Sequence, residues 1–371
     1  MSAAPSAEAD SVYMRRALDL ARKGWGQTAP NPMVGAVVVR DGEIVGEGYH
    51  ARYGEAHAEV NALHASRGRT RGATIYVTLE PCAHHGKTPP CVNAIIDARI
   101  ARVVVAVRDP TFIAGGGAER LRDAGIEVDV GVEREAACEL NAPFFAAGTY
   151  HRPWVVLKLA ITADGAVADP TGRRRWITGP ASRREVHRMR ANSDAILVGI
   201  GTVLADDPEL TVRDAPAPRI APRRIILDPG LRIPLSSKLV RSAREVDTRA
   251  IASIGYEHTN RSKLEEAGVR IAIHGSLSGT LGNTRLVEGV RSLLVEAGPR
   301  VAGSFLGESH VDRLVIFRSP LVFGGDAPKA FEFLPPGFEE SLGQYPVVER
   351  RKFGDDVMTI YALRDVPCSP D

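Results

Sequence analysis

Cysteine is scarce in this chain, which contains four in 371 residues. Cys82 and Cys91 stand close together, whereas Cys138 and Cys368 lie far apart in the sequence. So low a content is untypical of small secreted proteins, which depend on several disulfides. We therefore expect no disulfide framework, and we expect the protein to work in a reducing compartment, the cytoplasm.

Long hydrophobic runs are missing as well. No apolar stretch approaches the roughly 20 residues that a transmembrane helix needs, so we expect no membrane partner. Residues 1–10 are rich in Ala, Ser and Pro and have neither the basic region nor the apolar core of a signal peptide. We expect this stretch to be a frayed tail.

A large charge of either sign is also absent, because the formal net charge is +2. Residues 1–147 contain 16 Lys/Arg against 18 Asp/Glu, a balance of −2, and the remainder carries +4. An enzyme that acts on nucleic acid usually has a basic surface on its own domain. The charge therefore favours a small-molecule substrate and argues against a nucleic-acid partner.

The length suggests two domains, and the content of 44% hydrophobic and 25% charged residues is ordinary for a globular protein. In the first part, hydrophobic periodicity and turn residues predict a β-hairpin followed by alternating helices and strands. The expected helices are 11–23, 56–67, one that begins with Thr88 as its N-cap, 118–124 and 133–147; the expected strands are 33–40, 43–49, 73–79, 103–107 and 126–130. This order predicts an α/β/α sandwich.

A polar linker near residues 148–153 marks the expected boundary, after which the α/β pattern starts again. The expected elements are a helix at 181–191 and strands at 154–161, 195–200, 224–227, 249–253, 270–273, 292–295 and 314–317, with a closing hairpin of 347–352 and 357–363. We therefore assign residues 1–147 and 152–371 to two α/β domains.

The strongest functional signal is a set of four residues in the first domain: His57, Glu59, Cys82 and Cys91. One imidazole and two thiolates can hold a tetrahedral zinc ion and leave the fourth position open for water, as catalytic zinc sites do. Zinc makes hydroxide available near neutral pH. Glu59 is close enough to His57 to move protons, and the H-x-E…P-C pattern is that of zinc-dependent base deaminases.

Other interpretations of these residues remain open. Taken singly, each cysteine could be a buried apolar thiol and His57 a core histidine, but the four together in this order favour a metal site. A purely structural zinc site would need a fourth protein ligand, which His84 or His85 could supply. A non-catalytic zinc module is a further possibility, against which Glu59 argues.

The spacing of the two cysteines is unusual, since base deaminases have C-x₂-C and this chain has eight residues between Cys82 and Cys91. With its HHGKTPPC sequence, the segment resembles the family of bifunctional riboflavin-biosynthesis deaminase–reductases. The second half is similar to the reductase domain of the same family in segments such as 157–160, 176–178, 202–208, 295–298 and 323–325.

The resemblance covers nearly the whole chain and implies a cytidine-deaminase-like domain followed by a dihydrofolate-reductase-like domain. It implies zinc and NADPH as cofactors and Glu59 as the catalytic acid/base. The substrate contacts implied for the deaminase are Asn31, His50, His84, Lys87 and Asp109. The NADPH contacts implied for the reductase are Ala160, Trp176, Thr202, Asp206, Gly298, Pro299, Arg300, Val301, Ala302, Gly303 and Ser304.

For the reductase substrate, the resemblance implies contacts with Arg174, Arg190, Leu210, Arg213 and Glu296. Arg174 stands where the family often has serine, so that contact is an open question. In isolation, Trp176 could equally be a core aromatic, and Asp206 and Arg213 could belong to ordinary surface ion pairs.

The implied function is deamination of 2,5-diamino-6-(5-phosphoribosylamino)pyrimidin-4-one followed by reduction of its ribosyl group to ribityl. We expect the protein to form a homo-oligomer, and the sequence does not indicate the number of its subunits. The main alternative is a nucleoside or nucleic-acid base deaminase with a non-catalytic C-terminal domain; the long spacing between Cys82 and Cys91 and the acidic first half argue against it.

Overall fold

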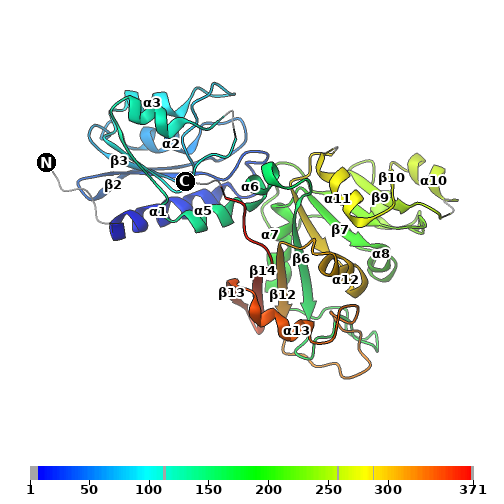
Figure 1. The fold of residues 1–371 in the computed structure, drawn as a ribbon. Helices are drawn as coiled ribbons and strands as arrows, with labels where there is room; N and C mark the ends of the chain where they lie inside the picture. The colour runs from blue at the N-terminus through cyan, green and yellow to red at the C-terminus, as the bar shows by residue number, and fades with distance from the viewer. Residues whose placement is uncertain (1–6, 112–113, 257–258, 287, 369–371) are drawn as a thin grey trace. The chain divides into compact units, whose positions relative to one another are not determined.

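The structure is a computed structural model that describes residues 7–111, 114–256, 259–286 and 288–368 (Figure 1). The chain forms two compact units. Residues 7–149 and the C-terminal 366–368 belong to the first, and residues 150–365 to the second. In these described ranges, no helix has both the length and the apolar character that a membrane crossing requires.

The first unit is built on a five-stranded sheet with the strand order β2-β1-β3-β4-β5. Strand β1 is antiparallel to both of its neighbours, and β3, β4 and β5 are mutually parallel. The strands are β1 (Gly35–Arg40), β2 (Glu43–Tyr49), β3 (Thr74–Val77), β4 (Arg102–Val105) and β5 (Glu127–Val130). The hairpin of β1 and β2 turns at Asp41 and Gly42, as the sequence predicts.

Helices cover both faces of this sheet, because alternate side chains of each strand point to opposite sides. Val37, Val39 and Tyr76 pack in one core, while Val38 and Ile75 pack in the other. The first core is covered by α1 (Ala7–Ala21), α5 (Arg134–Leu140) and α6 (Ala142–Thr149), and the second by α2 (Ala58–Ala65), α3 (Cys91–Asp97) and α4 (Gly117–Asp123). A short 3₁₀ helix, η1 (Arg22–Gly24), follows α1. The predicted α/β/α sandwich is confirmed.

Three helix boundaries differ from the prediction. Helix α1 begins at Ala7, inside the stretch expected to be a frayed tail, and Asp10 is buried there and pairs with Arg102. The helix expected to start with Thr88 as N-cap begins at Cys91, with Pro90 in the N-cap position. The helix expected over 133–147 is interrupted at Asn141, whose side-chain amide accepts from the Met33 N–H and donates to the Met33 carbonyl, both at 2.8 Å. A distant loop thus decides where this helix breaks, and its influence is invisible in local sequence.

The second unit is built on a nine-stranded sheet with the order β10-β9-β8-β7-β11-β6-β12-β14-β13. The first seven strands in that order are parallel, and β14 and β13 add the predicted antiparallel hairpin at one edge. The strands are β6 (Trp154–Ile161), β7 (Ala195–Gly199), β8 (Arg223–Leu227), β9 (Thr248–Ser253), β10 (Arg270–His274), β11 (Ser292–Glu296), β12 (Arg313–Arg318), β13 (Val347–Phe353) and β14 (Asp356–Ala362).

Helices also lie on both faces of the second sheet. One face packs against α11 (Leu277–Leu286) and α12 (Pro299–Gly307). The other packs against α7 (Pro180–Ala191), α8 (Ile200–Asp206), α9 (Lys238–Arg241) and α10 (Arg261–Glu266). The short α13 (Phe338–Ser341) and 3₁₀ helix η2 (Leu342–Gln344) precede the closing hairpin.

One disulfide corrects an expectation from the sequence. Cys138 of α5 is bonded to Cys368, and their Cα atoms lie 5.9 Å apart, within the usual range for a disulfide. Val366 and Cys368 also pack against the apolar core beneath α1 and α5. The chain therefore returns to the first unit after completing the second, and the bond fixes that return.

Loss of this bond should lower the stability of the first unit. We expect Cys368→Ala to cost about 2–5 kcal/mol of unfolding free energy, as is usual for a lost native disulfide. Melting of the parent with and without a phosphine reductant measures the effect, and peptide mapping without reductant should find the two cysteine peptides linked. A reductant effect of the same size in the Cys368→Ala variant would contradict this role.

Candidate active sites

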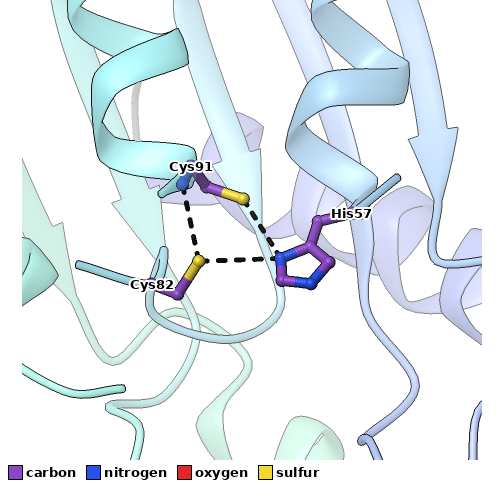
Figure 2. A group of neighbouring side chains, drawn as sticks. All are labelled: His57, Cys82 and Cys91. Atoms are coloured by element: carbon purple, nitrogen blue, oxygen red, sulfur yellow. Dashed lines mark hydrogen bonds between the residues drawn. The ribbon is translucent and has the colours of Figure 1, made fainter. Parts of the chain in front are cut away.

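The first site gathers at three chain positions on one side of the first sheet. His57 is the N-cap residue of α2, Cys82 follows β3, and Cys91 is the first residue of α3. The His57 Nδ1 atom lies 3.2 Å from the Cys91 Sγ and 3.6 Å from the Cys82 Sγ (Figure 2). Three potential metal-ligand atoms therefore converge within 4.8 Å of one another.

This donor set fits zinc. Zinc–sulfur and zinc–nitrogen bonds of about 2.3 and 2.0 Å at a tetrahedral angle place sulfur and nitrogen about 3.5 Å apart, close to the two distances seen here. A hydrogen bond with Cys91 lowers the pKa of the Cys82 thiol, and the same interaction raises the pKa of Cys91. Both cysteines would bind zinc as thiolates, so zinc binding would release protons.

The fourth position of such a site is left open by the protein. Within the described residues, neither His84 nor His85 joins the metal-binding group of His57, Cys82 and Cys91. The structural-zinc interpretation therefore lacks its fourth ligand. An open position is the arrangement of catalytic zinc sites, where water or substrate binds.

Glu59 lies in the first turn of α2 and is only 3% exposed. Burial raises the pKa of its carboxyl above the ordinary value, although the charge of His57 opposes that shift. The carboxyl also interacts with the Cys91 thiol, which places it beside the metal-binding atoms. A buried carboxyl with a raised pKa is suited to accept and return protons near neutral pH.

Asn31 and His50 form a second wall of this site. The Asn31 Nδ2 lies 3.4 Å from the His50 Nε2, and the His50 ring stands edge-on to the His57 ring at 5.3 Å. The other ring nitrogen of His50 lies 3.2 Å from the Ala56 carbonyl. Burial lowers the pKa of His50, so its imidazole is neutral and can recognise an uncharged ring by hydrogen bonding.

The segment between the cysteines brings several polar groups to the same place. Its Lys87 ammonium lies over the Tyr53 ring, 4.2 Å from the centroid, and the Thr88 hydroxyl lies 3.4 Å from the His57 Nε2. The His84 Nδ1 is buried and has no hydrogen-bond partner in the described structure. His85 is exposed.

Asp109 lies in the loop after β4 and is held there by two short interactions. Its carboxylate accepts from the Thr111 N–H at 2.8 Å and from the Thr111 hydroxyl at 2.6 Å, and its own N–H donates to Glu80. Burial raises the pKa of Asp109, and the Cys82 thiolate acts in the same direction. Asp109 is therefore close enough to Cys82 to sense its charge.

The second unit contains a buried cluster of charges at the carboxyl end of β11. Glu296 is 8% exposed, and the Arg190 guanidinium of α7 binds both of its carboxylate oxygens, at 2.5 and 3.0 Å. Lys158 lies opposite Glu296 in the β11–β6 pairing, with its Nζ 3.6 Å from the carboxylate. Burial would raise the pKa of Glu296, but Arg190 and Lys158 outweigh it and hold the pKa at about 2.

The same helix α7 fixes the chain around Thr211. The carbonyl of Thr211 lies 3.1 Å from the His187 Nδ1 and accepts from Arg190 at 3.0 Å, and the Arg213 N–H meets the His187 ring nitrogen. The structure thus brings the expected Arg190 and Glu296 together, and only the backbone N–H of Arg213 lies beside them. Leu210, by contrast, is only 2% exposed and packs in the core.

Two other expected substrate residues lie on the surface. The Arg213 side chain pairs with Glu209 and Thr211. Arg174 is exposed, and its backbone N–H donates to Asp169 at 2.9 Å. Arg213 therefore belongs to an ordinary surface ion pair, as the alternative interpretation allowed, whereas Asp206 forms no ion pair among the described residues.

The residues expected to bind NADPH lie where parallel strands end. The α8 helix follows β7 and carries Thr202 and Asp206, and α12 follows β11 with Gly298 as its N-cap. A Cβ atom on Gly199 would lie 2.8 Å from the Val301 side chain, so glycine permits these two helix starts to approach closely. Ligands of open α/β sheets bind at this edge, and the first amides of helix α12 suit an anionic group.

Not every residue of the expected NADPH set is open to a ligand. Ala302 is fully buried in the core, and Gly303 packs against Phe333. Trp176 is 55% exposed, and the guanidinium groups of Arg175 and Arg183 lie over its ring, 5.1 and 4.9 Å from the centroid, so the core-aromatic interpretation is wrong.

Several polar groups at these sites were not singled out from the sequence. Lys158 alternates with the core residues Leu157 and Leu159, which places it on the α7 face of β6 with Glu296. Strand alternation could have predicted its direction, but the pairing with β11 depends on a strand that lies far away in sequence. Tyr53 likewise reaches Lys87 only through the folded loop.

Two family models match the chain. Residues 7–107 match the zinc-binding region of cytidine and deoxycytidylate deaminases, and residues 153–348 match the RibD C-terminal domain. The riboflavin biosynthesis protein RibD of Aquifex aeolicus is 49% identical over 320 residues, covering 85% of this chain and 88% of that protein. RibD of Escherichia coli is 40% identical over 368 residues, covering 94% and 98%.

Solved structures agree with these matches. RibD of Acinetobacter baumannii superposes with a TM-score of 0.82 at 34% identity, covering 96% of this chain and 99% of that one. A deaminase/reductase from Thermotoga maritima gives a TM-score of 0.80 at 36% identity, with the same coverage.

Fold and site together define a two-domain enzyme in which a zinc-dependent deaminase precedes an NADPH-dependent reductase. The chain belongs to the RibD family of bifunctional riboflavin biosynthesis enzymes. This membership confirms both the resemblance found in the sequence and the two expected cofactors, and it removes the non-catalytic zinc module from consideration.

Proposed function

We propose that the chain deaminates 2,5-diamino-6-(5-phosphoribosylamino)pyrimidin-4-one and then reduces the ribosyl group of the product to ribityl. The observation that carries this proposal is the cluster of His57, Cys82 and Cys91 beside the buried Glu59, in one chain with a RibD-type reductase domain. The structure named as a diaminohydroxyphosphoribosylaminopyrimidine deaminase and 5-amino-6-(5-phosphoribosylamino)uracil reductase, 36% identical, supports these substrates.

In the deaminase, His57, Cys82 and Cys91 would hold zinc, which when bound supplies an activated water near neutral pH. Glu59 would take a proton from the attacking water and pass it to the ring nitrogen, while the water oxygen bonds to the amino-bearing ring carbon. It would then move the proton of the new hydroxyl to the amino group, so that the C–N bond breaks, ammonia leaves and a carbonyl remains. Asn31, His50, His84, Lys87 and Asp109 bind the substrate, and Lys87 meets its phosphate.

In the reductase, NADPH when bound supplies the hydride that converts the ribosyl side chain into ribityl. The residues assigned to the cofactor are Ala160, Trp176, Thr202, Asp206 and the helix start 298–304, supported by their place at the carboxyl ends of β6, β7 and β11. Arg174, Arg190, Leu210, Arg213 and Glu296 are assigned to the phosphorylated substrate. Arginines suit this role because their planar donors match phosphate oxygens in pairs.

The domains that carry the two activities are residues 1–147 and 152–371, and residues 366–368 at the end of the second pack against the first. We propose that the enzyme works in the cytoplasm as a homo-oligomer. Thiol labelling of Cys138 and Cys368 in intact cells tests the location, because a reducing cytoplasm should leave a fraction of this pair open to the reagent. Light scattering of the purified protein tests the assembly.

The proposal as a whole is tested by giving the purified, zinc-loaded protein the diaminopyrimidine phosphate together with NADPH. Release of ammonia and oxidation of NADPH should both occur. A panel of nucleosides and single-stranded nucleic acid should release far less ammonia. Ammonia from the panel but not from the diaminopyrimidine phosphate would reject the proposed substrate.

Replacing Lys87 should mainly weaken substrate binding. A charge-assisted interaction with phosphate contributes about 1.5–3 kcal/mol, so Lys87→Ala should raise KM by about one to two orders of magnitude. Steady-state kinetics with the phosphorylated substrate and its dephosphorylated nucleoside measure this, and the nucleoside should be almost indifferent. Equal losses on both substrates would show that Lys87 acts on the base or on the fold.

A further inference from the structure

Lys87 is the exposed cation of the segment between the zinc-site cysteines, yet its side chain has a defined place. The ammonium lies 4.2 Å from the centroid of the Tyr53 ring, within the distance of a cation–π interaction. The stem of the lysine passes over Gly54, where an added Cβ would lie 3.8 Å from the Lys87 Cδ. Tyr53 and Gly54 thus form a small platform on which Lys87 rests.

This platform is tied to the zinc site on both sides in sequence. His50 precedes it, and the His50 ring contacts the Ala56 carbonyl at 3.2 Å; His57 follows it as the N-cap of α2. The Tyr53 N–H also donates to the Gln27 carbonyl at 3.2 Å, which joins the platform to the loop that carries Asn31. The backbone of Tyr53 is therefore held in a fixed relation to the metal-binding residues.

Lys87 is also anchored on its own side of the site. Its neighbour Thr88 places its hydroxyl 3.4 Å from the His57 Nε2, and the Thr88 carbonyl accepts from the Gly86 N–H at 3.2 Å. In the part of the chain that the structure describes, Lys87 forms no ion pair with a carboxylate. The aromatic ring attracts the ammonium without neutralising it, so the charge and its N–H donors stay available to an anion.

We propose that Tyr53 is a positioning residue that holds the Lys87 ammonium ready for the phosphate of the deaminase substrate. The inference rests on the proposed function, since it assigns Lys87 to that phosphate. Tyr53 itself touches neither the reacting ring nor the metal. Its contribution is to restrict a long, flexible side chain to the part of its range where the phosphate arrives, so that less conformational freedom is lost on binding.

The test compares Tyr53→Leu, which removes the aromatic ring, with Tyr53→Phe, which keeps it. An exposed cation–π interaction predicts that Tyr53→Leu raises KM for the phosphorylated substrate about two- to fivefold with little change in kcat. Tyr53→Phe should stay close to the parent. For the dephosphorylated nucleoside, neither variant should shift KM. If turnover of the nucleoside is too slow to follow, its inhibition constant is measured instead and should also be unchanged. Zinc content should equal that of the parent in both variants.

A double variant separates positioning from general damage. In a Lys87→Ala background, Tyr53→Leu should have no further effect on KM, because the interaction it serves is already gone. Equal shifts for phosphorylated and dephosphorylated substrate, or additive effects in the double variant, would overturn the inference. An unchanged KM in Tyr53→Leu, with a parent protein that deaminates the phosphorylated substrate, would also overturn the inference. That outcome would not affect the proposed function. Absence of ammonia release by the zinc-loaded parent would instead reject the proposed function itself.

Discussion

Replacing Cys82 by serine should reduce ammonia release to the background rate. A serine hydroxyl is not deprotonated near neutral pH, so the site would keep only His57 and Cys91 as strong donors and its zinc affinity would collapse. Zinc lowers the pKa of a bound water from about 15.7 to about 7, and that activation would be lost with the metal. Metal analysis and an ammonia assay on the same sample measure the two effects together.

The same variant should keep its second activity. The cluster of Glu296, Arg190 and Lys158 and the helix starts after β7 and β11 all belong to the second compact unit, whereas the thiols belong to the first. Given substrate that is already deaminated, Cys82→Ser should oxidise NADPH at close to the parent rate. The matched variant Asp206→Ala should show the reverse pattern, with impaired NADPH oxidation and intact ammonia release.

Folding must be followed in this comparison, because loss of zinc also removes binding energy from the first unit. Two separate melting transitions, one for each unit, would show which part of the protein each substitution affects. If Cys82→Ser lost both activities while its second unit melted as in the parent, the assignment of the two reactions to separate sites would be wrong.

Replacing Glu59 by glutamine should lower the rate of deamination by a factor of about 10²–10⁴ or more. General acid/base groups contribute about that much, and Glu59 is assigned two successive proton transfers. Glutamine keeps the shape of the side chain but can neither accept nor return a proton in the same way. Rapid-quench or steady-state measurement of ammonia release gives the size of the effect.

Zinc content is the control for this second prediction. Glu59 is not a member of the group of metal-binding atoms, so Glu59→Gln should retain the metal at the parent level. Its NADPH oxidation on deaminated substrate should also be unchanged. If the variant keeps more than about a tenth of the parent deaminase rate, the role assigned to Glu59 is wrong.

Much of the first site could be predicted because its chemistry is carried by short sequence patterns. His57 and Glu59 share one helix start, and Cys91 opens another helix, so local structure alone fixes their directions. The hairpin at Asp41 and Gly42 and the order of the strands also follow from local sequence signals. The residues of the first site come together because the segments that carry them meet at one edge of the sheet, and the order of the elements already implies this.

The features that escaped prediction depend on contacts between distant segments. Asn141 breaks a helix because it binds Met33, and Cys138 meets Cys368 because the chain end returns to the first unit. Thr88 was expected to cap α3, but Pro90 holds that position and the Thr88 hydroxyl faces His57 instead. The composition shows that cysteines are few, but it does not show which two of them lie close enough in the fold to form a disulfide.

The second site was less accessible to sequence reasoning than the first. Its charges come from β6, α7 and β11, which are far apart in the chain and meet through strand pairing and helix packing. Leu210 and Ala302 illustrate the limit of assigning residues by position, since the side chains of both are buried in the core and leave only the backbone to contact a ligand. The resemblance located the region, and the structure shows which of its side chains are accessible.

The most direct test of two successive reactions in one chain is a single time course with the diaminopyrimidine phosphate as the only pyrimidine substrate. Ammonia and NADPH should be followed together in the zinc-loaded protein and after treatment with a strong chelator. The account predicts that ammonia appears first and NADPH oxidation follows with equal final amounts. The chelated protein should do neither until deaminated substrate is added, when NADPH oxidation alone resumes. NADPH oxidation by the chelated protein without added deaminated substrate would contradict the account.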